Sequence, residues 1–142
     1  MKESTSIPPD LIQAYRETHY RVEGATPFTL RVGQASEEVI KAFEESGLKS
    51  CAFVTAWNPY SIALKPEENA IRERKLILHL NAQGLAHTPG EGVHPSNGWT
   101  GERSSLIWGV SDESAREIAT AFQQNAFIWV GDGGIPELIL LR

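Results

Sequence analysis

A short apolar run at residues 51–56 is followed at once by side chains that hydrogen-bond and stack. These side chains are Thr55 at the end of the run and Trp57, Asn58, Tyr60 and Ser61 after it. Pro59 has no N–H for a β-ladder and favours an extended or turn conformation at Asn58, so the strand must end beside it. In open α/β sheets, ligand sites gather beyond the carboxyl ends of strands. We therefore expect this loop to form part of a ligand site. The alternative is an Asn-Pro turn whose aromatic side chains pack over the sheet edge.

Two polar residues of the next predicted helix, Asn69 and Arg72, are expected to lie near this loop. The helix spans about 66–83, and at about 100° per residue it places Asn69 on the inward face with the core leucines. A buried asparagine needs hydrogen-bond partners, and most such partners are backbone groups. We therefore expect Asn69 to tie down the loop at 58–61, with direct ligand contact as the alternative. Arg72 flanks the same face, where its guanidinium could clamp a phosphate or a carboxylate.

Glycines and prolines break any periodicity between residues 89 and 103, which predicts a long loop. Loops of this length inside compact domains are often functional. The loop carries Glu91, Trp99 and Glu102, and we expect it to cover the ligand site. The two carboxylates would form an acid–base pair only if the loop folded them together.

No other combination of reactive residues matches a known catalytic or metal-binding pattern. His87, Glu91 and His94 fall within eight residues but lack a zinc spacing. No serine lies in a nucleophile elbow, and there is no Walker or complete dinucleotide pattern. We therefore expect no metal and no cofactor, and the sequence leaves open whether the protein is an enzyme.

Length and composition favour a single domain over residues 1–142, preceded by a disordered leader at 1–8. The chain is 41% hydrophobic and 22% charged, which is ordinary for a soluble protein. Its formal charge of −5 gives no general attraction to nucleic acid or to anionic membranes. The only cysteine, Cys51, lies in the apolar run, so no intramolecular disulfide can form. With no secretory signal and no apolar run of about 18 residues, a cytoplasmic location is the expectation.

The hydrophobic periodicity predicts an α/β or α+β domain with a mixed sheet of about six or seven strands and three main helices. The expected strands are 19–22, 28–32, 51–56, 85–88, 105–110, 126–130 and 137–141. The three main helices lie between Ser36 and Gly47, at 66–83, and from Ser111 or Asp112 to Phe122, after a short helix that opens at Pro8. We expect 51–56 to be a central strand buried on both faces. The connection from 28 to 56 is long enough for a parallel crossover.

Several segments resemble a bacterial family of unknown function, domain of unknown function 3293. They are 27–33, Thr55-Ala56-Trp57-Asn58-Pro59-Tyr60-Ser61, Glu68-Asn69, 89–92, 99–102 and Gln124-Asn125-Ala126. The resemblance extends from about Tyr15 to Arg142. Lys65-Pro66 stands where the family usually has a serine-like helix cap. Because the family has no assigned activity, the resemblance implies the domain boundaries and no reaction.

The leading hypothesis is a polar pocket that binds a small nucleotide-like or sugar-like metabolite. It would form from Thr55, Asn58, Tyr60, Ser61, Asn69 and Arg72 under the loop that carries Glu91, Trp99 and Glu102, with Trp57 or Tyr60 stacking on a planar group. The alternative is a non-catalytic protein-interaction or regulatory module. Its motivation is the four tryptophans, since tryptophan is enriched at interface hot spots. Trp57 and Trp99, in predicted loops, are the interface candidates, whereas Trp108 and Trp129, in predicted strands, are expected in the core.

Overall fold

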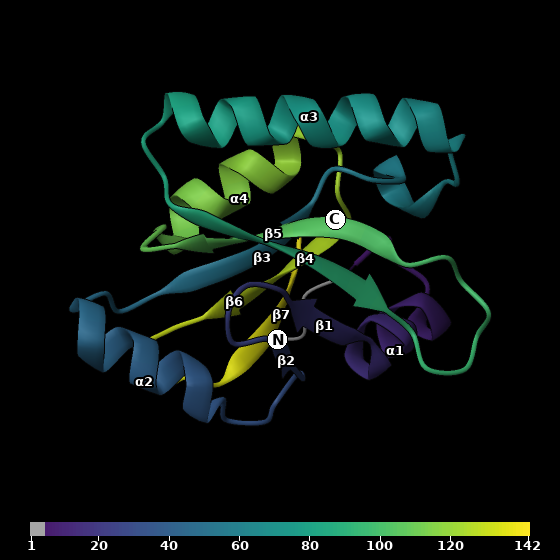
Figure 1. The fold of residues 1–142 in the computed structure, drawn as a ribbon. Helices are drawn as coiled ribbons and strands as arrows, with labels where there is room; N and C mark the ends of the chain where they lie inside the picture. The colour runs from purple at the N-terminus through teal and green to yellow at the C-terminus, as the bar shows by residue number, and fades with distance from the viewer. Residues whose placement is uncertain (1–4) are drawn as a thin grey trace.

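In the computed structural model, which describes residues 5–142, one sheet is covered by helices on both faces (Figure 1). The helices are α1 (Pro9–Glu17), α2 (Glu37–Ser46), α3 (Pro66–Ala82) and α4 (Asp112–Ala121), with a short 3₁₀ turn η1 (Pro59–Ser61). The strands are β1 (His19–Val22), β2 (Phe28–Leu30), β3 (Cys51–Thr55), β4 (His87–Val93), β5 (Glu102–Trp108), β6 (Ala126–Val130) and β7 (Pro136–Leu140). The predicted α+β class and the strand number are confirmed.

The strand order is β2-β1-β4-β5-β3-β6-β7, and every pairing is antiparallel. The sheet is therefore not mixed, and the predicted parallel crossover from 28 to 56 is wrong. β2 and β3 do run in the same direction, but three strands separate them. The physical reason is the β4–β5 hairpin, which pairs with β1 on one side and with β3 on the other. As predicted, β3 lies inside the sheet with a partner on each side.

The two faces of β3 are buried in two different cores, because successive side chains of a strand point to opposite faces. Ala52 and Val54 pack in the core that contains the inward residues of α3 and α4. Cys51 and Phe53 pack in the core that contains Val39 and the rest of the inward face of α2. This arrangement confirms that the run is buried on both sides. It also leaves the end of β3, beyond the reach of α2, free to border a cavity.

The segment predicted as a long loop at 89–103 is a β-hairpin whose two strands include residues 89–93 and 102–103. β4 runs through Gly90 and Gly92, and the loop itself is limited to residues 94–101. A Cβ atom at Gly90 would lie 2.4 Å from the carbonyl oxygen of Arg21 and 2.8 Å from the Phe53 ring. Glycine is needed there because another backbone approaches closely, which is one reason for glycine inside a strand. The prediction was wrong for residues 89–93, because it took these glycines as loop residues, and right for residues 94–101.

The beginning of the described chain is packed against the rest of the molecule. Residues 1–4 of the predicted leader lie outside the described residues, but Ile7 is buried and Pro8 precedes α1 directly. Ile7 therefore belongs to the packed domain. Among residues 5–142, no helix has the length and apolar character needed to cross a membrane.

Candidate functional site

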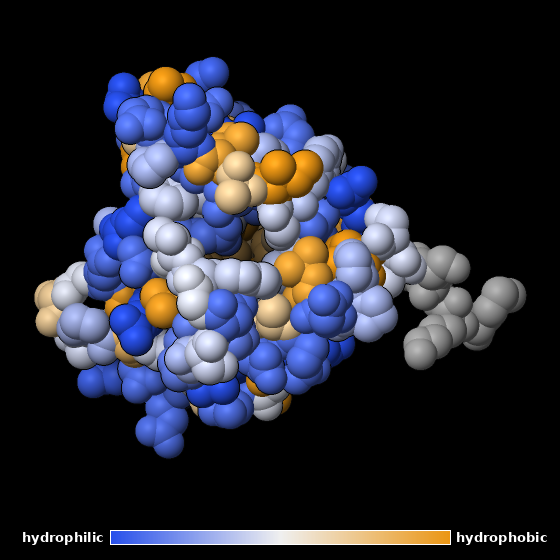
Figure 2. All heavy atoms as spheres, turned by 90° about the vertical axis from the view of Figure 1, so that its right-hand side faces the viewer, coloured by the Kyte–Doolittle hydropathy of each residue, from blue (hydrophilic) through white to orange (hydrophobic). Residues whose placement is uncertain are grey.

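A cavity of about 540 Å³ lies beyond the end of β3, on the same sheet face as α2. The side chains of Thr55 and Ser104 are paired across β3 and β5 and share this face with Phe53. The cavity is closed by α1, by the segment around η1 and by the 94–101 loop. Figure 2 shows the face on which these three elements lie, and it is hollowed near the centre.

The floor of the cavity is apolar, and its walls carry polar side chains among apolar ones. Tyr20, Phe53 and Ile128 belong to the buried cluster beneath α2 and also line the cavity. The rings of Tyr20 and Phe53 meet edge to face, with centroids 5.3 Å apart. The polar wall comprises Tyr15, Thr18, Thr55, Asn58, Ser61, Asn69, Glu102, Ser104, Gln124 and Asn125. Such a mixture is typical of small-molecule sites, where a few polar groups orient a largely apolar ligand.

The loop after β3 has an unusual backbone. Asn58, Tyr60 and Ser61 have φ angles of 50°, 54° and 60°, a left-handed region that residues other than glycine seldom adopt. Such strain persists only where surrounding contacts enforce it, and it is concentrated at functional sites. Here the Tyr60 N–H donates to the carbonyl oxygen of Gln123 at 2.7 Å, which holds the loop against the end of α4.

Asn69 and Asn58 form a reciprocal pair at the base of this loop. The Asn58 N–H donates to Oδ1 of Asn69 at 2.9 Å, and Nδ2 of Asn69 donates to Oδ1 of Asn58 at 2.8 Å. The same Oδ1 of Asn58 accepts from the Leu64 N–H at 3.0 Å. Asn69 is only 3% exposed. It therefore ties down the loop, as expected from its place on the inward face, while its side chain also borders the cavity.

Glu102, the first residue of β5, places a carboxylate in the cavity wall. Its Oε2 accepts from Nδ2 of Asn58 at 2.7 Å. Among the described residues no donor bonds to Oε1, and no lysine or arginine forms an ion pair with the group. Burial raises the pKa of Glu102 to about 7, and the hydrogen bond from Asn58 opposes this rise. A carboxyl group that is half-ionised near neutral pH could bind a cation or exchange a proton.

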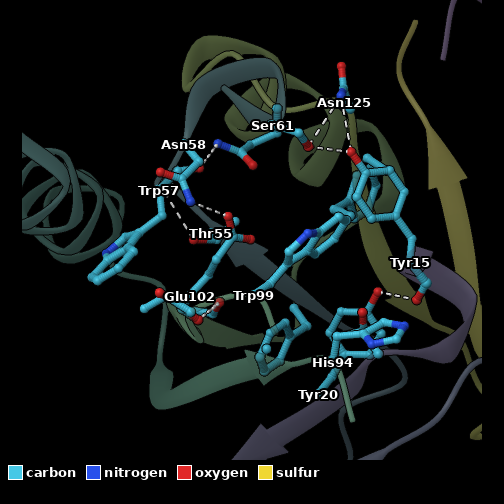
Figure 3. A pocket seen from close by; sticks show the side chains of 18 of the residues that line it. Tyr15, Tyr20, Thr55, Trp57, Asn58, Ser61, His94, Trp99, Glu102 and Asn125 are labelled. Atoms are coloured by element: carbon cyan, nitrogen blue, oxygen red, sulfur yellow. Dashed lines mark hydrogen bonds between the residues drawn. The ribbon is translucent and has the colours of Figure 1, made fainter. Parts of the chain in front are cut away.

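A second polar group stands on another side of the cavity, where α1 meets η1 and β6 (Figure 3). The hydroxyls of Tyr15 and Ser61 are 2.6 Å apart, and Nδ2 of Asn125 donates to the Tyr15 hydroxyl at 3.0 Å. The Asn125 side chain is held from behind by Arg142, which donates to its Oδ1 at 3.2 Å. Two hydroxyls carry two hydrogens, and the contact between them uses only one. Among residues 5–142 the other hydrogen has no recorded acceptor, so it could donate to a bound molecule.

The 94–101 loop covers part of the cavity mouth. Nδ1 of His94 accepts from the N–H groups of Ser96 and Asn97 at 3.1 and 3.0 Å, and Nε2 lies 3.0 Å from a carboxylate oxygen of Glu17. Because Nδ1 accepts, Nε2 must carry the proton and donate to Glu17. Trp99 packs beside the His94 ring, with centroids 6.0 Å apart, and is 50% exposed at the mouth.

The structure places most of the predicted site residues around this one cavity. Those that line it are Thr55, Trp57, Asn58, Tyr60, Ser61, Asn69, Trp99 and Glu102. Trp57 borders the cavity, but its Nε1 donates to Glu73 at 3.0 Å. The Tyr60 ring stacks on the guanidinium of Arg142, 4.1 Å from the ring centroid. Neither ring is therefore as free to stack on a ligand as the sequence-based hypothesis expected.

Arg72 does not line the cavity, and its predicted role as an anion clamp is wrong. Its Nε donates to the carbonyl oxygen of Ala56 at 2.5 Å. Its NH2 group donates to the carbonyl oxygen of Phe122 and, at 3.1 Å, to the side chain of Gln123. The guanidinium thus joins the end of β3 to the end of α4. The planar guanidinium, with its several N–H donors, can bind two neighbouring carbonyl oxygens as well as it can bind a phosphate.

Glu91 also lies outside the cavity, and it forms no acid–base pair with Glu102. Glu102 is paired with Gly92 across β4 and β5, whereas Glu91 is paired with Arg103. Neighbouring positions along a strand face opposite sides of the sheet, so the two carboxylates point apart. On the far face, Glu91 lies 3.8 Å from Arg103, which also binds Glu23.

The contributions of α1 and of the segment before β6 to the site were not predicted from the sequence. Tyr15, Gln124 and Asn125 line the cavity but were not among the expected site residues. Both amides are buried, and Nε2 of Gln124 donates to the carbonyl oxygen of Trp57 at 3.1 Å. Two consecutive amides directly before an apolar strand were the available signal, because buried amides require specific partners.

The site and fold together define an α+β domain with one antiparallel sheet and a small-molecule-sized cavity at the end of an interior strand. The chain belongs to the family described as Protein of unknown function (DUF3293), whose model matches residues 54–127. The matched region begins in β3 and ends in β6, and so includes both the loop after β3 and Glu102. Searches of curated proteins and of solved structures found no match.

Proposed function

We propose that the protein binds a small organic molecule in the cavity beyond β3. The observation that carries this proposal is the cavity itself, about 540 Å³ in volume with an apolar floor and a polar wall. Ligand sites commonly measure roughly 300–1,000 Å³ and have this composition. The volume suits a molecule about the size of a nucleobase, a nucleoside or an aromatic amine.

The charge of the lining narrows the ligand class. The described residues that line the cavity include no lysine and no arginine. Two arginines lie close to it: Arg72 is occupied by backbone carbonyls, and Arg142 by Asn125 and the Tyr60 ring. A phosphate group would thus find a carboxylate in the wall and no cation to pair with it. The nucleotide-like ligand expected from the sequence is therefore narrowed to molecules without a phosphate, such as an uncharged or cationic base or nucleoside.

The strained loop gives independent support. Three non-glycine residues with positive φ, Asn58, Tyr60 and Ser61, stand together at the cavity wall. A turn that served only to connect β3 with α3 would be more stable with glycine at such positions. Residues from five of the segments that carry the family resemblance, 55–61, 68–69, 89–92, 99–102 and 124–126, also line this cavity.

A metabolite-library thermal shift on wild type and a cavity-filling variant tests the proposal. Gly92 lines the cavity, has no positive φ, and offers a new Cβ atom ordinary contacts of 3.7 Å or more to Thr18 and Tyr20. Gly92→Leu should therefore fill the cavity without blocking folding. The control is Gly133→Leu, the same change at a site with open space. The proposal predicts compounds that stabilise wild type and Gly133→Leu but not Gly92→Leu, and it fails if no compound discriminates among the three.

A protein-interaction role is the second candidate, and Trp99 is the observation that favours it. Trp99 is 50% exposed in a loop, whereas Trp108 and Trp129 are partly buried against the two cores. A half-exposed tryptophan is a typical hot-spot residue. If the protein acts mainly in this way, a stoichiometric partner should co-purify from native lysate and be lost on Trp99→Ala. Loss of the partner without any discriminating small molecule would favour this function over the first.

A further inference from the structure

We infer that the cavity recognises an organic cation, whose positively charged nitrogen binds the free oxygen of Glu102; this inference rests on the proposed binding function. The ligand class is a protonated amine with an aromatic or aliphatic body. Its ammonium group would lie against Glu102, and its apolar body over the floor formed by Tyr20 and Phe53.

The first argument is the unpaired charge. The Glu102 carboxylate is mostly buried, accepts one hydrogen bond from Asn58 and has no cationic partner among the described residues. Burying an ionised carboxylate without a counter-charge is costly, and the cost appears as a raised pKa, here about 7. A ligand cation would supply the missing partner.

The second argument is the aromatic lining. Tyr15, Tyr20, Phe53 and Trp99 border the same cavity, and Tyr20 and Phe53 form an edge-to-face pair in its floor. The negative faces of aromatic rings attract cations, and aromatic walls are a recurrent way of recognising substituted ammonium groups. In Figure 3, the Trp99 indole lies between the Glu102 side of the cavity and the Tyr15–Ser61 side. It is therefore placed to cover a ligand bound to either.

The titratable groups packed around Glu102 come from several other elements, and among the described residues none forms an ion pair with it. The other titratable residues that line the cavity are Tyr15 from α1, Tyr20 from β1, Tyr60 from η1 and His94 from the loop. Burial raises the pKa of Tyr20 further above its ordinary value of 10, so this group stays neutral. His94 already uses both ring nitrogens within the loop and with Glu17. Arg103, Glu23 and Glu91 interact with one another on the opposite face of the sheet.

Matched amine and alcohol pairs provide the test. A panel of primary arylalkyl and alkyl amines is titrated by calorimetry, each beside the alcohol of the same skeleton; it includes phenethylamine with phenethyl alcohol and tryptamine with indole-3-ethanol. Such amines stay protonated up to pH 8, because their pKa values are about 10, like that of lysine. At pH 8 at least one amine should bind at least tenfold more tightly than its alcohol.

The pH dependence gives a sharper readout. A cation binds the ionised form of Glu102, so its affinity should fall by up to about tenfold per pH unit below pH 7 and level off above it. Below pH 7 each amine bound should release close to one proton, measurable in buffers of different ionisation enthalpy. Glu102→Gln should remove both the preference for the amine and the pH dependence. Glu91→Gln, on the opposite face of β4, should retain both.

The inference is overturned if the alcohols bind as tightly as the amines, if amine affinity is independent of pH, or if no amine in the panel binds. The library experiment separates this failure from failure of the proposed function. Compounds that bind wild type but not Gly92→Leu, with no preference for a cation, would leave the binding function standing and reject the cation. If no compound distinguishes Gly92→Leu from Gly133→Leu, the binding function itself is rejected.

Discussion

Asn58 and Glu102, which are 44 residues apart in the sequence, are joined by a hydrogen bond of 2.7 Å from Nδ2 to Oε2. This bond connects the strained loop after β3 to the first residue of β5. Because Asn58 is held in turn by Asn69, the carboxylate, the loop and the start of α3 form one connected unit. Changes to any of these three residues should therefore alter both stability and the cavity.

Glu102→Gln should stabilise the protein more at alkaline than at acidic pH. Burial raises the pKa of Glu102 from 4.5 to about 7, so between these values the folded state binds more protons than the unfolded chain. The free energy of unfolding contributed by this group therefore falls as the pH rises through this window. Glutamine is neutral throughout and can still accept from Asn58. The advantage of the variant should grow by up to about 3 kcal/mol between pH 4.5 and pH 8.

Urea unfolding of both proteins at several pH values between 4.5 and 8 measures this difference. Glu91→Gln is the control, because that carboxylate lies on the opposite face and near Arg103. If the stability difference between Glu102→Gln and wild type were the same at every pH, the pKa of Glu102 would not be raised in the folded protein.

Arg72→Ala should destabilise the protein without changing the lining of the cavity. Arg72 donates to the carbonyl oxygens of Ala56 and Phe122, and both would lose a charged donor. Each such bond contributes roughly 1.5–3 kcal/mol. The loss of stability should therefore be several times that caused by Arg74→Ala, which removes an exposed arginine of the same helix. Arg72→Lys should recover only part, since an ammonium lacks the planar fork. Equal melting temperatures for the two alanine variants would contradict this structural role.

Asn69→Ala should also lower stability, because it leaves the buried N–H of Asn58 without its acceptor. Leaving such a group unpaired costs roughly 1–3 kcal/mol, and about 1 kcal/mol shifts the melting temperature of a domain of this size by roughly 3–5 °C. Asn81→Ala is the matched control on α3, where the asparagine is exposed and its side chain forms one hydrogen bond among the described residues, with His87. A neutral Asn69→Ala would mean that the loop holds its strained backbone without this pair.

The local parts of the fold were predictable from the sequence because their signals are local. Ser36 caps α2 by accepting from the Val39 N–H, and Gly47 ends the helix at φ 78°, as the residue types predicted. The apolar run at 51–56 was correctly identified as an interior strand. The order of the strands was not predictable, because insertion of the β4–β5 hairpin between β1 and β3 depends on pairings between distant segments.

The site was predictable where it follows a strand and unpredictable where it depends on tertiary contacts. The loop after β3 and Asn69 could be placed together from helical and strand periodicity. Arg72 could not be assigned, because its partners are the backbone carbonyls of residues 56 and 122, which carry no side-chain signal. That Glu91 and Glu102 lie on opposite faces of the sheet follows only from the register between β4 and β5, which the sequence does not reveal.

Gly90 and Gly92 lie two residues apart on the same face of β4 but should respond to substitution in opposite ways. A Cβ atom at Gly90 would lie 2.4 Å from the Arg21 carbonyl oxygen, which is backbone and cannot move aside without breaking the pairing of β1 with β4. At Gly92 the nearest atoms, on Thr18 and Tyr20, are 3.7 Å or more away, an ordinary contact distance. Overpacking a core typically costs about 1–3 kcal/mol and sometimes more. Replacing a glycine by alanine without strain instead stabilises the protein by roughly 0.4–1 kcal/mol, because alanine lowers the conformational entropy of the unfolded chain.

Chemical unfolding of Gly90→Ala and Gly92→Ala tests this contrast with the same substitution two residues apart on one strand. Gly90→Ala should be strongly destabilised or fail to accumulate as folded protein, whereas Gly92→Ala should be at least as stable as wild type. Failure of Gly90→Ala to fold would still agree with the register, because Gly92→Ala is the variant that must remain folded. Equal stability of the two variants would mean that β1 and β4 are not paired in the register that brings Gly90 against Arg21. The same register places Gly92 opposite Tyr20, which lines the cavity.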